Sequence, residues 1–89
     1  MKNEELRSQL EKLHNELHQS HGLDLQQREL LQTLADEIQA LLKRDEIQRH
    51  HYTSLSERLN DAVAELEASH PQITLLMRQT IDSLAYLGI

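Results

Sequence analysis

The sequence predicts an all-α protein of antiparallel helical hairpins, which form either a four-helix bundle or an elongated, coiled-coil-like helical dimer. Three observations support this prediction. The 89-residue chain is rich in leucine but has no Phe, no Trp and two Tyr, a composition typical of helical bundles. Its apolar residues recur at helical spacing. The helix breakers Gly22, Pro71 and Gly88 all stand where that periodicity stops.

Length and charge limit the class of protein further. A chain of 89 residues forms one small domain, near the size at which burial is marginal and self-association helps. The net charge of −6, without a block of Lys and Arg, argues against nucleic-acid and anionic-membrane partners. The absence of Cys excludes disulfides and thiolate chemistry. Because no secretory signal or bilayer-spanning stretch is evident, we expect a cytoplasmic protein.

The first two helices are predicted over residues 3–20 and 24–44, each with a leucine-rich seam. Gly22 can adopt the left-handed conformation that ends a helix, and Asp24 with Gln27 fits a capping box that starts the next one. The connection is so short that the second helix must fold back on the first. These residues therefore predict an antiparallel hairpin.

The polar stretch that follows, residues 43–53, allows two interpretations. In the first, the helix breaks near residues 49–53 and a third helix over 54–68 begins at a capping box formed by Ser54 and Glu57. In the second, helices two and three are continuous, because the apolar seam keeps its phase through the stretch. A continuous helix would exceed the usual length in globular proteins, so we favour the break.

The last helix is predicted over residues 71–87, with Pro71 in its first turn and Gly88 at its end. It carries only two charges, Arg78 and Asp82, and its apolar residues cover more than one narrow stripe. A helix of this kind requires burial on two sides, which a closed monomeric four-helix bundle or a homodimer would provide, and we favour the homodimer because the chain is small. The predicted interface consists of Ile73, Leu76, Met77, Thr80, Ile81, Leu84 and Leu87.

Three of the six histidines are candidates for metal ligands. His14, His18 and His21 follow one another at i, i+4 and i+7, a spacing that can present imidazoles on one helical face to a metal. His18 is expected to face solvent, however, and His21 lies at the end of the helix beside Gly22. We therefore predict no metal or cofactor site and regard a solvated polar face as the simpler interpretation.

Other polar groups suggest no enzyme. Ser69, His70, Asp82 and Ser83 have suitable side chains, but no nucleophile elbow or Gly-rich phosphate loop accompanies them. Two Glu-x-x-His motifs do not place their ligands in a bundle core, as a di-iron site would require. The pair His50-His51 is either a pH-sensitive joint or a solvated linker. An acidic row on the third helix is either a solvated face or a docking surface for a basic partner: Glu57, Asp61 and Glu65.

Several segments also resemble a known family. They are the opening Glu5-Leu6-Arg7, the run Glu67-Ala68-Ser69-His70-Pro71, and the ending Ile81-Asp82-Ser83-Leu84-Ala85 with Leu87-Gly88-Ile89. Together they resemble the small bacterial proteins of domain of unknown function 4404. The resemblance implies a small protein with no assigned activity, cofactor or catalytic residues, and it supports a break near residues 44–53.

Taken together, the sequence predicts a non-catalytic helical interaction or scaffold protein that self-associates through its C-terminal helix. The alternative is a small metal-binding or metal-responsive protein that uses His14, His18 and His21.

Overall fold

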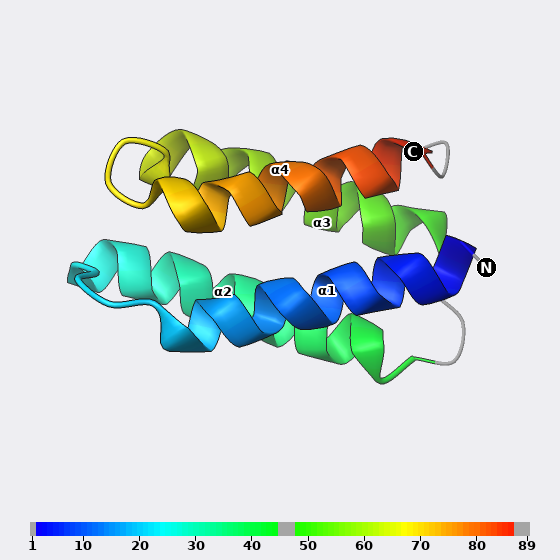
Figure 1. Cartoon of the computed structure of the whole chain (residues 1–89). Helices are drawn as coiled ribbons and strands as arrows, with labels where there is room; N and C mark the ends of the chain where they lie inside the picture. Colours follow the sequence, from blue (N-terminus) through cyan, green and yellow to red (C-terminus); the bar gives the residue numbers. More distant parts are fainter. Residues whose placement is uncertain (1, 45–47, 87–89) are drawn as a thin grey trace.

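The chain folds into four α-helices joined by short connections, as the computed structural model shows for residues 2–44 and 48–86. The helices are α1 (Lys2–Gln19), α2 (Leu25–Leu42), α3 (Arg49–Leu66) and α4 (Pro71–Tyr86). They run alternately in opposite directions along the long axis of the molecule (Figure 1). Each helix packs against two others, in the pairs α1–α2, α2–α3, α3–α4 and α1–α4. The predicted all-α class is confirmed, and its form is a closed four-helix bundle of 35 × 21 × 19 Å.

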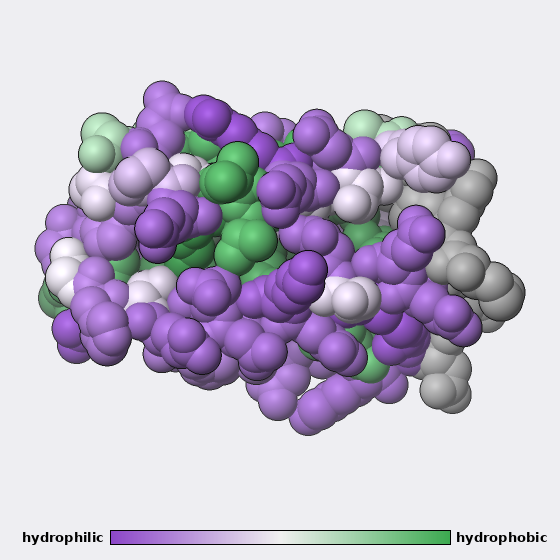
Figure 2. Space-filling view, in the orientation of Figure 1, coloured by the Kyte–Doolittle hydropathy of each residue, from purple (hydrophilic) through white to green (hydrophobic). Residues whose placement is uncertain are grey.

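The core lies along the axis of the bundle and is built from one apolar stripe of each helix. Leu10, Leu34 and Leu59 illustrate the pattern, because each is at most 1% exposed and comes from a different helix. Fully burying one such side chain contributes about 1.5–3 kcal/mol. The side of the molecule seen in Figure 2 is mostly hydrophilic. Amphipathic periodicity therefore determines which side of each helix faces inward.

The α1–α2 turn follows the sequence prediction closely. Gly22 has a φ of 70°, the left-handed conformation that a glycine adopts without the steric cost of a side chain. The Gln27 backbone N–H donates to Asp24 Oδ1 at 2.8 Å, and the Asp24 N–H donates to Gln27 Oε1 at 3.2 Å. This reciprocal pair is the predicted capping box, and it satisfies two backbone donors at the start of α2.

The α2–α3 connection contains the favoured break, but the break lies before residues 49–53. Because α2 ends at Leu42 and α3 begins at Arg49, the predicted continuous helix is wrong, and so is a helix start at Ser54. The Gln48 backbone N–H donates to His51 Nδ1 at 3.2 Å, so His51 serves the start of α3. Ser54 lies inside α3 and donates to Glu37 Oε1 of α2 at 3.1 Å. Residues 45–47 of this predicted connection lie outside the described residues.

The α3–α4 turn occupies the predicted place. α3 ends at Leu66, and α4 begins at Pro71, whose fixed φ and missing N–H suit a first helical turn. The Thr74 hydroxyl donates to the Pro71 carbonyl at 2.9 Å within this turn. The predicted helix end at Gly88 lies outside the described residues.

Candidate functional site

The residues predicted to form an interface on α4 lie mainly inside the bundle. Leu76 and Ile81 are partly buried against the core, and Leu87 lies outside the described residues. The other four are in the core itself, at most 6% exposed: Ile73, Met77, Thr80 and Leu84. α4 packs between α1 and α3, so both of its apolar rows are covered within one chain. A second copy could not reach the four core residues without opening the bundle.

The buried hydroxyl of Thr80 is accommodated by local hydrogen bonds. It donates to the Leu76 carbonyl one turn earlier, at 2.9 Å, and accepts from Gln9 Nε2 of α1 at 3.4 Å. A buried hydroxyl is costly unless it is paired in this way. Thr80 is therefore a polar contact between α1 and α4 rather than a group available to a partner.

The side of α4 that faces away from the bundle carries an exposed apolar residue among few charges. We call Leu75, Arg78, Gln79, Asp82 and Tyr86 the outer α4 surface; all five are exposed, Leu75 by 57% and Tyr86 by 73%. Its two charged side chains have opposite signs. Figure 2 shows hydrophobic residues interrupting the hydrophilic surface over α4 and between α4 and α1. Of the three large hydrophobic side chains exposed among the described residues, two, Leu75 and Tyr86, therefore share this face of α4.

The outer surface of α1 provides the contrast. Its exposed positions include Glu5, Glu11, Lys12 and Glu16, so charge covers most of this helix. Arg78 of the outer α4 surface forms an ion pair with Glu67, the residue that follows α3, at 2.5 Å, and both side chains are more than half exposed. Exposed pairs of this kind contribute little to stability, about 0–1 kcal/mol. The Arg78 charge therefore remains accessible on the surface.

The structure brings together two of the three candidate metal ligands and separates the third. The Nε2 atoms of His14 and His18 are 3.3 Å apart, with ring centroids 4.5 Å apart and planes at 74°. His14 is half-buried and His18 is exposed. His21 lies in the α1–α2 turn, where its backbone carbonyl accepts a hydrogen bond from His70 Nε2. Within residues 2–44 and 48–86, no group of three or more His, Asp or Glu side chains is placed to hold a metal.

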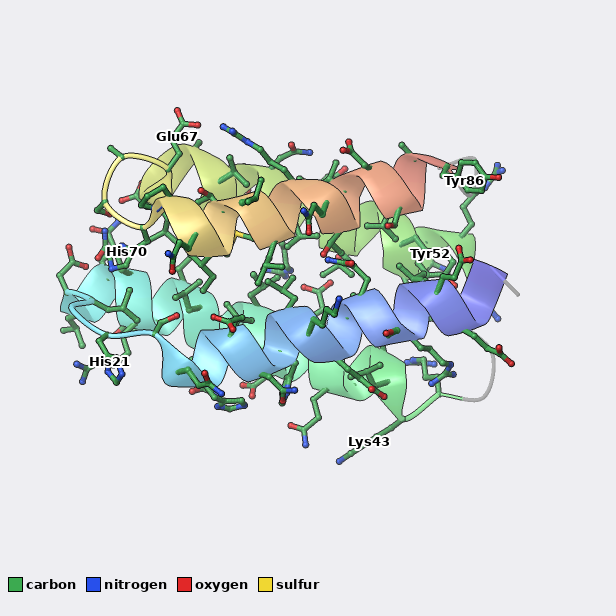
Figure 3. All side chains as sticks on the ribbon, viewed as in Figure 1. His21, Lys43, Tyr52, Glu67, His70 and Tyr86 are labelled. Carbon is green, nitrogen blue, oxygen red and sulfur yellow. The ribbon has the colours of Figure 1, made fainter. Side chains whose placement is uncertain are left out.

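A chain of hydrogen bonds ties the two turns at one end of the bundle together. Gln27 Nε2 donates to Ser69 Oγ at 3.3 Å, Ser69 Oγ lies 2.9 Å from His70 Nδ1, and His70 Nε2 lies 3.2 Å from the His21 carbonyl. A carbonyl can only accept, so Nε2 carries the proton and Nδ1 accepts from the Ser69 hydroxyl. We call this arrangement the turn clasp; Figure 3 shows His21 and His70 at the same end of the molecule.

The turn clasp has a seryl hydroxyl next to an imidazole, but not the geometry of a nucleophile and its base. The Nε2 atom of His70 is held by the His21 carbonyl, and Ser69 and His70 are neighbours in an exposed turn. Asp82 and Ser83, the other groups considered for catalysis, lie three turns further along α4. The arrangement therefore links α2 to the α3–α4 turn, and that is the role the hydrogen bonds support.

His51 at the start of α3 has an altered acid–base behaviour. Desolvation of the ring, followed by the charges of Arg44 and His50, lowers the pKa of His51 below 6.5. Its ring lies 4.0 Å from that of His50, centroid to centroid. A lowered pKa keeps the imidazole neutral, which it must be to accept the Gln48 N–H. The histidine pair thus lies within a helix start and not in a solvated linker.

The predicted acidic row lies on α3 beside the groove between α2 and α3. Glu57, Asp61 and Glu65 are exposed, and Asp61 and Glu65 line that groove together with Arg58. Arg58 Nε forms an ion pair with Glu37 Oε2 of α2 at 2.6 Å, which joins the two helices. Docking of a basic partner on this row remains a prediction.

Comparison with known protein families gives a match over most of the chain. A family model described as domain of unknown function (DUF4404) covers residues 6–89. The chain belongs to the DUF4404 family. The predicted family resemblance is therefore confirmed. No curated protein and no solved structure matches the chain.

Two segments on which the DUF4404 resemblance rested make contacts that were not predicted. Ser69 and His70 form the turn clasp. Arg7 of α1 donates from Nη1 to the Leu42 carbonyl at 2.8 Å and from Nη2 to the Arg44 carbonyl. A guanidinium there pairs with the unsatisfied carbonyls at the end of α2. Sequence spacing could not reveal either role, because both depend on partners at least 35 residues away.

The described residues of this DUF4404 chain contain no helix with the length and hydrophobicity of a membrane span.

Proposed function

We propose that this DUF4404 protein is a non-catalytic interaction module that self-associates through the outer α4 surface. The observation that supports this proposal is the 57% exposure of Leu75 on the helix side with few charges. The core residues Ile73, Met77, Thr80 and Leu84 stay inside each bundle. The contact therefore joins two folded bundles and needs no exchange of helices.

The charges on α4 suit a second copy of the same chain. In an antiparallel pair of α4 helices related by a two-fold axis, Arg78 of each copy faces Asp82 of the other. The same arrangement places Leu75 near Ala85 and Tyr86 of the second copy. The chain has a net charge of −6, so two copies repel each other over most of their surfaces. The outer α4 surface carries one charge of each sign, so this repulsion is weak there.

The proposed contact is small. One outer helix face buries less surface than a standard interface between stable partners, so the dimer should dissociate on dilution. The acidic row on α3 lies outside this contact and stays available for a basic partner.

The solution mass, measured by light scattering over a wide dilution series, tests this proposal. We expect wild-type protein to pass from monomer to dimer as its concentration rises, and Leu75→Glu to remain monomeric because a buried carboxylate costs several kcal/mol. Leu25→Glu is the matched control, since Leu25 is 72% exposed at the start of α2 and lies outside the proposed contact. Both variants should keep the helical circular dichroism spectrum of the wild type.

Light scattering also tests the proposed antiparallel pairing of Arg78 with Asp82 of the second copy. Arg78→Glu should weaken the dimer, and the double variant Arg78→Glu/Asp82→Arg should restore it, because the exchanged charges again face each other. A wild-type protein that stays monomeric at every concentration would refute self-association. A dimer that survives Leu75→Glu would show that another surface makes the contact.

A further inference from the structure

We propose that His14 and His18 form a two-imidazole binding site for a zinc-like divalent transition metal on the surface of α1. This site is separate from the outer α4 surface and goes beyond self-association. It uses two of the three candidate histidines and leaves His21 out, because among the described residues no third side chain of this kind is grouped with the pair.

The geometry of the pair supports this assignment. Residues four apart on a helix are neighbours on its surface, and the Nε2 atoms of His14 and His18 converge to 3.3 Å. Two Zn–N bonds of about 2.0–2.1 Å at a tetrahedral angle place their nitrogens about 3.3–3.4 Å apart. A zinc ion could therefore bind both nitrogens with little movement of either ring. The helix has already placed the two ligands.

The same distance also fits a hydrogen bond between two neutral imidazoles. In that state one Nε2 atom donates its proton to the hydrogen bond and the other accepts the bond. To bind a metal through both Nε2 lone pairs, the donating ring moves its proton from Nε2 to its own Nδ1, so that both rings then carry their protons on Nδ1. The metal thus replaces the hydrogen bond between the two rings without release of a proton, and metal titration shows whether it does.

The surroundings define what kind of site this is. His18 is exposed and lines the groove between α1 and α2 with Arg28 and Gln32, so water can complete the coordination of the metal. Within the part of the chain that the structure describes, no third carboxylate or imidazole joins the pair. The cationic Arg28 opposes a metal ion, whereas the net charge of −6 attracts one. An open site with two protein ligands exchanges its metal readily, unlike a closed structural zinc site.

Binding at this site should also stabilise the fold. The two nitrogens converge only while the last turns of α1 are helical, so a metal bound there favours the native state over the unfolded chain. The melting temperature therefore provides a second measurement that depends on the helix and not only on the presence of histidine.

The experiment is calorimetric titration of the full chain with Zn²⁺, in a buffer alkaline enough to keep imidazoles neutral. We expect one ion per chain, with affinity reduced at least about tenfold by His14→Ala or His18→Ala. His21→Ala is the matched control and should bind as the wild type does. Zn²⁺ should raise the melting temperature of the wild type and of His21→Ala, but not that of His18→Ala.

Two outcomes would overturn the proposal. One is no Zn²⁺ binding by the wild type. The other is binding that His18→Ala leaves unchanged, which would place the ion at other histidines such as His50 and His51. Because His18 is exposed, its variant should fold normally, and circular dichroism verifies this. Repeating the titration on Leu75→Glu separates metal binding from self-association.

Discussion

At the end of the bundle where the α1–α2 and α3–α4 turns meet, Gly22, the capping box of α2 and the turn clasp hold the chain in place. At the opposite end, where α2 connects to α3, Arg7 binds two carbonyls at and just after the end of α2, and a neutral His51 serves the start of α3. The first end depends on a glycine conformation, a helix cap and hydrogen bonds between two turns, and the second on the Arg7 guanidinium and the His51 ring. Salt should therefore affect the Arg7 contacts more than the Gly22 turn.

The largest expected effect is at the first end, with Gly22→Val. A β-branched residue at a φ of 70° is strained, although a side chain there would meet no neighbouring atom within 4 Å. We expect a loss of about 2 kcal/mol in the free energy of unfolding, measured with urea. Gly22→Asn should lose less, because asparagine tolerates the left-handed conformation better. Equal stability of Gly22→Val and wild type would show that the turn relaxes without cost.

A smaller effect is expected at the second end from Arg7→Met. This change keeps most of the apolar stem of the side chain but removes the donors to the Leu42 and Arg44 carbonyls. Because Arg7 is only half-buried, we expect a loss of about 1 kcal/mol in urea unfolding. The loss should shrink as salt is added, since the interaction is partly electrostatic. Lys12→Met, at an exposed position of the same helix, is the control and should change stability little. If both variants behave alike, Arg7 does not support the end of α2.

The smallest effect concerns pH and His51. The pKa of His51 is lowered in the folded chain from 6.5, so the unfolded chain takes up the proton first as the pH falls. The contribution of His51 to stability is complete above pH 6.5, decreases below that value, and is lost once the pH has passed the lowered folded pKa. NMR titration of the His51 ring should show this lowered pKa directly.

The variant His51→Gln tests whether protonation of His51 causes this loss of stability at low pH. A glutamine carbonyl can accept the Gln48 N–H without titrating, so the difference between wild type and variant should appear only as the pH falls. Taking this difference cancels the titration of the histidines that lie away from His51 and leaves the charges of Arg44 and Arg49 unchanged. A difference that is independent of pH would contradict a role for the His51 proton.

The same contrast explains how much of the fold the sequence could predict. At the turn end, Gly22, the Asp24–Gln27 capping box and Pro71 act within a few residues of chain, and the structure shows each in the predicted role. At the other end, Ser54 looked like a helix start, but its hydroxyl bonds to Glu37 of α2. The true start depends on the ring of His51, which is not a favoured capping group. Local sequence rules cannot identify such a contact.

The candidate sites, too, could be predicted from the sequence only in part. Periodicity correctly identified α4 as apolar on two sides, and a bundle satisfies that requirement by giving each helix two neighbours. The sequence alone could not show that Met77 and Thr80 are buried within their own bundle, because a dimer would bury them equally well. The spacing of His14 and His18 was visible, but the distance between their Nε2 atoms depends on side-chain rotamers. The link from Gln27 to Ser69 spans 42 residues and left no local pattern.

The four helices pack in a closed ring, each against its two neighbours, and this arrangement affects how the chain folds. Among the described residues, α1–α2, α2–α3 and α3–α4 join consecutive helices, and α1–α4 alone joins the two ends of the chain. Most native contacts are therefore close in sequence, and bundles of such low contact order fold in microseconds to milliseconds. Either hairpin can form first at a small loop-closure entropy. The pairing of α1 with α4 then closes the ring, so the leucine seams are exposed to other chains only briefly after synthesis.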